Sequence, residues 1–195
     1  MEIDELKLNS YIKVYENFLP KKVNEKYTKY VCSLKEFEQG AISGEEDFVN
    51  KTIRNVLIFN CTNLEQEKSF TNIHWTNLLM GLLTNKIKEY FLNFNESCNH
   101  FKVNTLQILK YNVGGHYKVH SDMGSRTPRS LSFIYLVNDN YEGGDLIFFS
   151  PVSNKQIKIK NKKNTLIVWP SNFLYPHGVT PVTKGVRYSV VAWAV

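Results

Sequence analysis

Residues 130–150 read SLSFIYLVNDNYEGGDLIFFS and contain two short apolar runs. The runs, residues 130–137 and 145–150, have the length and the β-branched and aromatic content typical of strands. The polar run 138–140 and the pair Gly143-Gly144 lie between them, and such residues favour turns. This stretch therefore predicts two β-strands separated by turns.

The same texture extends from about residue 101 to the end of the chain. Further short β-rich runs lie at residues 105–111, 117–120, 156–159, 165–169 and 187–195. Turn-forming residues separate them, namely Gly114, Gly115, Pro151, Asn161, Pro170, Pro176 and Gly185. About seven short strands at this spacing predict a sandwich or a barrel.

The first hundred residues have a different, mainly helical pattern. Apolar residues recur at helical spacing over 21–37, after Pro20, and again over 75–94, where Thr71 or Asn72 is the expected cap. Residues 11–15 alternate as a strand does, and residues 56–59 fit either a strand or a buried turn. We expect one domain over residues 1–195, with 1–100 as helical support outside a β core formed by 101–195.

Composition limits the class of protein. The chain has 195 residues, 43% of them hydrophobic, which is enough for a sizeable core. It contains no apolar run of membrane-helix length and no N-terminal signal pattern. Cys32, Cys61 and Cys98 form no CxxC pair, and each is expected to be a small, partly buried apolar side chain. We therefore expect a cytoplasmic protein without a membrane partner.

The net charge of +6 includes one local lysine cluster, residues 155–163, with the sequence KQIKIKNKK. This segment fits a strand with a solvated face followed by a turn. It also fits a patch for an acidic partner or a nucleic acid. The sequence favours the first interpretation and leaves the second open.

His120 and Asp122 form the first candidate for chemistry. On an extended chain, residues two apart point to the same face, so an imidazole and a carboxylate converge there. A third ligand must come from elsewhere, and His177, in the turn-like context Pro176-His177-Gly178, is the candidate. Two histidines and one carboxylate are the facial triad of non-haem iron(II) oxygenases.

The other histidines are weaker candidates. His116 lies four residues before His120, about 13 Å away on a strand, which is too far to share a metal. The neighbouring glycines could bend the chain, so a substrate role for His116 stays open. His74 and His100 lie near helix ends and are expected to be surface or capping residues.

Arg187 is a candidate for anion binding. On a strand it shares one face with Ser189, Val191 and Trp193. If that face is the interior, the guanidinium needs an anion, and a bound carboxylate would fit its fork. The alternative is a surface arginine, with Val190, Ala192 and Val195 pointing inside instead.

Several of these residues occur together as ordered motifs. The motifs, in chain order, are Tyr111-x-x-Gly114-Gly115-x-Tyr117-x-x-His120-x-Asp122, Ile134-Tyr135-Leu136, Gly143-Gly144-Asp145-Leu146, Pro176-His177-Gly178-Val179 and Arg187-Tyr188-Ser189. In this order they resemble the 2-oxoglutarate- and iron(II)-dependent dioxygenases, above all the prolyl 4-hydroxylase branch. The resemblance covers residues 103–195 and, more weakly, the segment 11–20 with the helix after it.

The resemblance implies a fold, cofactors and residue roles. The fold would be a double-stranded β-helix, a cupin-like jelly roll with the N-terminal helices packed on one sheet. His120, Asp122 and His177 would bind Fe(II), and Arg187 would bind the distal carboxylate of 2-oxoglutarate. Tyr135 would donate its hydroxyl to that same carboxylate. Other positions expected in the cosubstrate pocket or the cavity are Tyr111, Tyr117, Ser189 and Trp193. Ascorbate binding, as reductant, is a further expectation.

The resemblance also implies an activity, the hydroxylation of an unactivated C–H bond with O₂ and release of succinate and CO₂. A prolyl residue of a peptide or protein is the preferred acceptor. Collagen-type enzymes often carry lysine at the anion-binding position, whereas this chain carries Arg187. An arginine there agrees better with the oxygen-sensing enzymes and their bacterial relatives. The acidic Asp145 departs from the motif and is assigned no role.

Two other functions stay open. The same chemistry could act on a small molecule, a free amino acid or a nucleic-acid base, although the repair branch carries a second arginine where this chain has Trp193. A cupin-like binding domain without turnover is the least favoured. The loops expected to select the substrate are residues 40–55, 123–130 and 151–164. Residues 123–129 fit a lid or an ordinary connecting loop.

Overall fold

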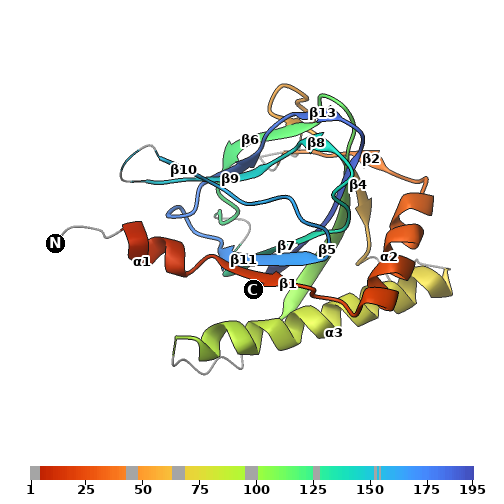
Figure 1. The fold of residues 1–195 in the computed structure, drawn as a ribbon, viewed down its shortest axis with the longest axis horizontal. Coiled ribbons are helices and arrows are strands. Elements are labelled where there is room, and N and C mark those ends of the chain that lie inside the picture. The colour runs from red at the N-terminus through yellow and green to blue at the C-terminus, as the bar shows by residue number, and fades with distance from the viewer. Residues whose placement is uncertain are drawn as a thin grey trace.

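Antiparallel strands form the centre of the computed structural model, which describes residues 5–42, 48–62, 69–94, 101–124, 128–151, 153 and 155–195 (Figure 1). The helices are α1 (Glu5–Ser10), α2 (Lys21–Ser33) and α3 (Phe70–Leu92). The strands are β1 (Lys13–Glu16), β2 (Glu38–Gln39), β3 (Arg54–Asn55), β4 (Leu57–Asn60), β5 (Val103–Tyr111), β6 (His116–His120), β7 (Leu131–Leu136), β8 (Glu142–Gly143), β9 (Leu146–Phe149), β10 (Gln156–Lys158), β11 (Thr165–Pro170), β12 (His177–Val179), β13 (Val182–Lys184) and β14 (Arg187–Ala194).

Two sheets contain almost all of these strands. The larger has seven strands in the order β1-β11-β7-β14-β5-β4-β2, and the smaller has five in the order β10-β9-β12-β6-β3. A third, two-stranded sheet pairs β13 with β8. All seven strand regions predicted within 101–195 are present, and the predicted sandwich of short strands is confirmed.

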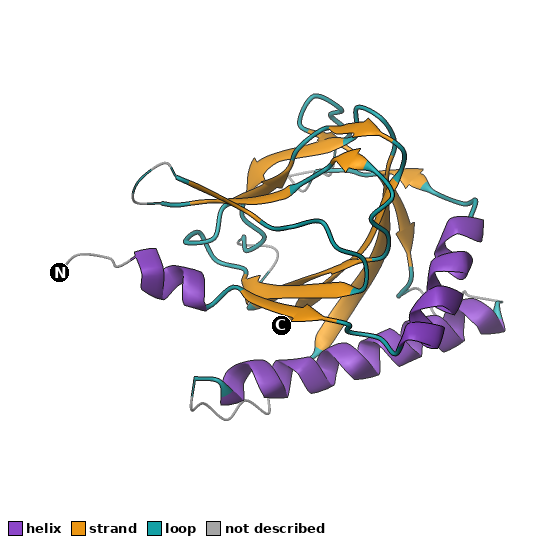
Figure 2. Ribbon diagram, viewed as in Figure 1, coloured by secondary structure: helices purple, strands orange, loops and turns teal. Residues whose placement is uncertain are grey.

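The large sheet is buried on both faces, because it is the middle layer of the molecule. One face packs against α2 and α3 through an apolar cluster that includes Tyr27, Leu79 and Val190. The other face packs against the small sheet through a second cluster that includes Ile134 and Phe148. Figure 2 shows α3 running along the outside of the strands. The sequence-based choice of one inward face for residues 187–195 is therefore too simple, since both faces are interior.

The first hundred residues do more than supply helices. Strands β1, β2 and β4 join the large sheet, and β3 joins the small one. Residues 56–59, which the sequence leaves between strand and turn, belong mostly to β4, paired with β5. None of the helices in the described ranges is both long and apolar enough to span a membrane.

Two helix boundaries differ from the prediction. Helix α2 begins after Pro20, as predicted, but ends at Ser33 because Leu34 turns into an extended conformation instead of continuing to Phe37. Helix α3 is capped by Ser69, whose hydroxyl accepts a hydrogen bond from the backbone N–H of Asn72. The predicted caps Thr71 and Asn72 are wrong, because Ser69 satisfies the first-turn donors two residues earlier.

The cysteines and the outer histidines have simple environments. Cys61 is buried in the core as predicted, whereas Cys32 is exposed. His74 lies near the start of α3 and packs its ring edge-on against Trp75. Cys98 and His100 lie outside the described residues, as do residues 43–47 and 125–127 of the predicted substrate loops.

Candidate metal centre

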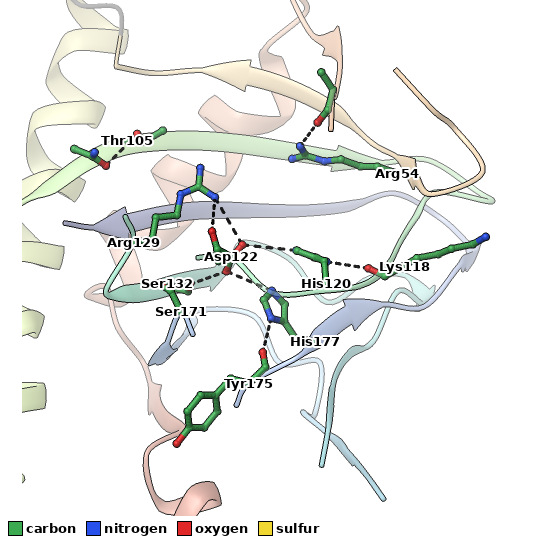
Figure 3. Close-up of polar contacts among 12 residues, drawn as sticks. Arg54, Thr105, Lys118, His120, Asp122, Arg129, Ser132, Ser171, Tyr175 and His177 are labelled. Atoms are coloured by element: carbon green, nitrogen blue, oxygen red, sulfur yellow. Dashed lines mark hydrogen bonds and ion pairs between the residues drawn. The ribbon is translucent and has the colours of Figure 1, made fainter. Parts of the chain in front are cut away.

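His120, Asp122 and His177 come together on two neighbouring strands (Figure 3). His120 ends β6 and His177 begins β12, and the two residues pair directly in the antiparallel ladder. One ligand atom from each of the three residues lies within 4.8 Å of the other two. Nε2 of His177 is 3.4 Å from Oδ2 of Asp122, and Nε2 of His120 is 3.7 Å from Oδ1. The predicted triad is therefore brought together in space.

The local setting of His177 differs from the prediction. The sequence places it in a turn, but the structure places it in β12, hydrogen-bonded between β6 and β9. Gly178 makes this close packing possible, because a Cβ there would lie 2.9 Å from the carbonyl oxygen of Tyr117. A strand held on both sides fixes the imidazole more firmly than a turn would.

The hydrogen bonds of both imidazoles leave Nε2 available as a metal ligand. Nδ1 of His120 is 2.9 Å from the carbonyl oxygen of Lys118, and Nδ1 of His177 is 3.0 Å from that of Tyr175. A carbonyl oxygen can only accept, so Nδ1 carries the proton in each ring. Nε2 of each ring then faces Asp122, and a backbone carbonyl that holds the other ring nitrogen is the usual way that metal-binding histidines are oriented.

The charge states also suit a cation. Burial and the facing His177 lower the pKa of His120 to about 3, so this ring is neutral at pH 7. Burial on its own would raise the pKa of the Asp122 carboxyl. The two imidazoles and the Ser132 hydroxyl outweigh burial and hold that pKa below its ordinary value. The trio thus offers the Nε2 atoms of two imidazoles and one carboxylate, the donor set of a mononuclear iron site.

Buried hydroxyls hold the carboxylate in place. Ser132 on β7 donates a hydrogen bond of 2.6 Å to Oδ2 of Asp122, and the Ser171 hydroxyl lies 2.7 Å from that of Ser132. Both serines are almost fully buried. Sequence analysis does not identify either residue, because an isolated serine in or beside a strand has no distinguishing pattern.

Arg187 forms a second polar centre, next to the ring of Tyr111. Its side chain is fully buried, and its Nη1 donates a hydrogen bond of 2.7 Å to the hydroxyl of Ser189. Nε and Nη2 have no hydrogen-bond partner among the described residues. The guanidinium lies 5.0 Å from the centre of the Tyr111 ring. A buried guanidinium with unused donors is costly unless it meets an anion, so the residues present fit a carboxylate here.

Tyr141 is the tyrosine beside this arginine. Burial raises the pKa of its hydroxyl, and nearby Arg187 opposes that shift. Arg187 acts on this buried hydroxyl through its charge and as a hydrogen-bond donor, but the pair does not reach the length and angle of an ordinary hydrogen bond. Gly144 packs between the two side chains, because a Cβ there would lie 2.9 Å from Cδ of Arg187 and 3.3 Å from Cε2 of Tyr141. Tyr141 directly precedes strand β8 and the pair Gly143-Gly144, and that glycine pair is the sequence signal that could have identified it.

The assignment of Tyr135 to the cosubstrate pocket is wrong. In the β7–β14 ladder Tyr135 pairs with Val190, so it points to the face opposite that of Arg187. Its hydroxyl donates a hydrogen bond of 2.6 Å to Oδ1 of Asn24 on α2 and lies 3.3 Å from Oδ1 of Asn164. Strand alternation, not chemistry, removes this tyrosine from the site.

A cavity of about 960 Å³ opens above the metal ligands and is lined by residues of both sheets. Tyr111, Tyr117 and Trp193 line it as predicted, and the Tyr117 ring stacks on that of His120 with 3.7 Å between ring centres. Two arginines that sequence analysis does not assign, Arg54 and Arg129, line it as well.

Other candidates lie away from this centre. Both ring nitrogens of His116 approach backbone carbonyl oxygens, those of Gly114 and Thr52, at 2.9 and 3.3 Å. In the lysine-rich segment, Lys158 pairs with Asp145 at 2.7 Å and Lys162 pairs with Glu16. These ion pairs support the reading of 155–163 as a solvated strand and turn.

Comparison with known families agrees with the sequence-based resemblance. Residues 106–195 match the family model described as the 2OG-Fe(II) oxygenase superfamily. A PKHD-type hydroxylase of Gloeothece citriformis is 33% identical over 120 residues, which cover 57% of this chain and 53% of the relative. A PKHD-type hydroxylase of Thermosynechococcus vestitus is 35% identical over 99 residues, which cover 47% and 42%. The chain thus spans about half the length of these curated relatives or less.

Solved structures confirm the fold. A Trichoplax adhaerens prolyl hydroxylase, in complex with a peptide fragment of the hypoxia inducible factor oxygen degradation domain, superimposes with a TM-score of 0.74. The match has 22% sequence identity and covers 97% of this chain and 86% of the other. A Pseudomonas putida prolyl-4-hydroxylase gives a TM-score of 0.67 at 21% identity, with coverage of 94% and 91%. The predicted double-stranded β-helix is therefore confirmed.

Proposed function

We propose that this chain is an Fe(II)- and 2-oxoglutarate-dependent dioxygenase that hydroxylates a C–H bond, with a prolyl residue of a peptide or protein as acceptor. One observation carries the proposal. A metal-binding trio, His120, Asp122 and His177, lines a cavity that is also lined by Tyr111, and Arg187 is buried against the Tyr111 ring with unused donors. The family match and the prolyl hydroxylase neighbours support the same activity.

The protein side of the reaction is mainly positioning. When bound, iron and 2-oxoglutarate supply the oxidising chemistry, in which O₂ is consumed, 2-oxoglutarate becomes succinate and CO₂, and a hydroxyl group enters the acceptor. Nε2 of both histidines and the Asp122 carboxylate hold the metal and leave coordination positions for other molecules. The side chains of the chain need not transfer a proton, which agrees with the absence of an acid–base pair from the described part of the cavity wall.

Arg187 and its neighbours would orient the cosubstrate. The unused Nε and Nη2 donors fit a carboxylate bidentately, and the buried Tyr141 hydroxyl beside them can donate another hydrogen bond. Ser189 fixes the guanidinium by accepting from Nη1. Apolar walls at Ile134 and Val191 limit water at the centre. Residues 1–195 as one unit, a cytoplasmic location and ascorbate as reductant are further parts of the proposal.

The test is turnover by the whole chain with Fe(II), O₂ and 2-oxoglutarate. Succinate release should rise when proline-containing peptides are added, and the peptides should gain the mass of one oxygen atom. Free proline, other amino acids and single-stranded DNA form the comparison panel. Stimulation by free amino acids but by no peptide would contradict the prolyl-peptide acceptor, and absence of succinate under every condition would contradict the dioxygenase activity.

A further inference from the structure

Two arginines line the cavity and are separate from the anion site at Arg187. In Figure 3, Arg54 and Arg129 lie on the side of the metal ligands away from Tyr175. They are close enough to each other that the charge of Arg54 helps burial to lower the pKa of Arg129. Neither residue belongs to the metal-binding trio, although Arg129 contacts one of its members, Asp122.

Arg129 is held by an aromatic ring and points its donors toward the cavity. Its guanidinium stacks over the ring of Trp193 at 3.7 Å. Its Nη1 makes a long hydrogen bond of 3.5 Å to the backbone oxygen of Asp122 and lies 3.9 Å from that residue's Oδ1. A guanidinium has five N–H groups, so most of them are left for another acceptor.

Arg54, on strand β3 of the small sheet, also lies over an aromatic ring. Its guanidinium lies 4.7 Å from the centre of the Tyr117 ring, which itself stacks on His120. One end donates a hydrogen bond to the backbone oxygen of Ala41. Nε is buried and has no partner among the described residues. Arg54 makes no ion pair with any acid in the parts of the chain that the structure describes.

Among the described residues that line the cavity, and apart from the metal ligands, positive side chains outnumber negative ones. Within the described ranges, and metal ligands aside, the ionised residues that line the cavity are Arg54, Arg129 and Glu38. Within the described ranges Glu38 forms no ion pair with either arginine. Guanidinium groups held flat on aromatic rings lose little freedom on binding and suit planar carboxylates. Among the described residues, Arg54 therefore has no anionic partner, and Arg129 has only its long contact with Asp122.

We propose that Arg54 and Arg129 form a subsite for a carboxylate of the acceptor, and that the acceptor is an acidic peptide with an Asp or Glu side chain close to the hydroxylated residue. The inference deepens the proposed function and rests on it for the identity of the reaction. In this inference the two arginines select among peptides, because iron and 2-oxoglutarate do not distinguish one peptide sequence from another.

A peptide suits this subsite better than a nucleic acid does. Proteins that take single-stranded nucleic acids or flipped bases stack them on open aromatic faces. Here Arg54 covers Tyr117 and Arg129 covers Trp193. A free amino acid would fill only a small part of a cavity of about 960 Å³.

The experiment measures binding without turnover. Fluorescently labelled peptides of one length, with a single proline flanked by Glu, Gln or Lys, are titrated with the full chain in Mn²⁺ and 2-oxoglutarate without O₂. Imidazole and carboxylate ligands accept Mn²⁺. The Glu peptide should bind about tenfold or more tightly than the Gln peptide, and the Lys peptide most weakly. R54Q and R129Q should each remove most of that preference.

Controls separate charge from folding. K184Q removes an exposed cation that pairs with Glu142 away from the cavity and should leave the preference unchanged. R129E should reverse the preference and favour the Lys peptide, a gain that an unfolded variant cannot show. Equal affinity for Glu and Gln peptides would overturn the inference, as would displacement of the Glu peptide by free glutamate or single-stranded DNA at the same concentration.

Failure of the inference and failure of the proposed function give different results. If the wild-type chain releases succinate with peptides but ignores their charge, the dioxygenase proposal stands and the carboxylate subsite does not. If it prefers acidic peptides in the binding assay but never releases succinate, the subsite stands and the activity does not.

Discussion

Two groups of buried polar residues, one on each face of the seven-stranded sheet, differ in how completely they are hydrogen-bonded. On the face toward the small sheet, Arg187 is buried beside Tyr141 with two guanidinium nitrogens, Nε and Nη2, that make no ordinary hydrogen bond to a described residue. On the face toward the helices, Tyr135 donates to Asn24, and Asn164 accepts from and donates to the backbone of Leu19. Similar residue types therefore serve different purposes on the two sides of one sheet.

The difference shows where a ligand is required. Buried polar groups in folded proteins are nearly always hydrogen-bonded, and exceptions need an explanation. The network around Tyr135 is complete within the protein and joins α2 to β7 and β11. The incomplete group around Arg187 lies against Tyr111, whose ring lines the same cavity as the metal-binding trio. For these two groups, completeness distinguishes a structural role from one that awaits a ligand, and each prediction below tests that distinction.

The largest effect is expected for Asp122→Ala on the site face. It removes the only carboxylate of the trio, and both imidazoles then face a gap. Turnover and iron content should fall more than roughly 100-fold, beyond the effect known for partners outside the ligand set. Succinate release and metal analysis measure the two losses. Asp139→Ala, at an exposed carboxylate, is the matched control, and an Asp122→Ala protein that keeps wild-type iron and turnover would exclude this metal site.

Arg187→Gln should have the next largest effect. It leaves the cosubstrate carboxylate without its buried partner, a loss of about 2–5 kcal/mol in comparable charge pairs. The KM for 2-oxoglutarate should therefore rise from roughly 30-fold to a few thousand-fold, while bound iron is retained. Lys184→Gln provides the control for the loss of one positive charge. A KM that stays at the wild-type value would mean that the unused donors of Arg187 serve another purpose.

Tyr141→Phe should weaken cosubstrate binding to a smaller degree. A hydrogen bond to a charged group contributes about 1.5–3 kcal/mol, so the KM for 2-oxoglutarate should rise about 10- to 150-fold. Steady-state kinetics with varied 2-oxoglutarate measure it. The variant keeps the ring that packs on Gly144 and Arg187, so its unfolding midpoint should hardly change. Loss of stability at constant KM would place Tyr141 among the structural residues.

Much of this arrangement could be predicted from the sequence, because it depends on local patterns. The strands within 101–195 follow from short apolar runs between turn residues, and all seven are present. His120 and Asp122 are two residues apart at the end of one strand, so their convergence needs no knowledge of the rest of the fold. Arg187 is identifiable because a charged residue begins an otherwise apolar strand.

The remainder depends on pairing over long distances. The face of Tyr135 follows from its register against Val190, which no local pattern reveals. The strand of His177 is three residues long and exists because β6 and β9 flank it. Arg54 lies in the two-residue strand β3 and Arg129 in a loop, and neither segment is long enough or regular enough to show a periodicity. Only folding brings them to one cavity, so their role could not be predicted from the sequence.

Tyr135→Phe should have the smallest effect on activity. It tests whether the polar groups on the sheet face toward α2 and α3 are purely structural. Removing the hydroxyl leaves Oδ1 of Asn24 buried without its donor, which should lower the free energy of unfolding by about 1–3 kcal/mol. The KM for 2-oxoglutarate should stay at the wild-type value, since the ring and the site face are unchanged. Urea unfolding measures the free energy of unfolding, and steady-state kinetics measure the KM.

The double variant Tyr135→Phe/Asn24→Leu should regain part of the lost stability, because it removes both partners instead of one. A raised KM with unchanged stability would instead return Tyr135 to the cosubstrate pocket and reverse the assignment of the two faces.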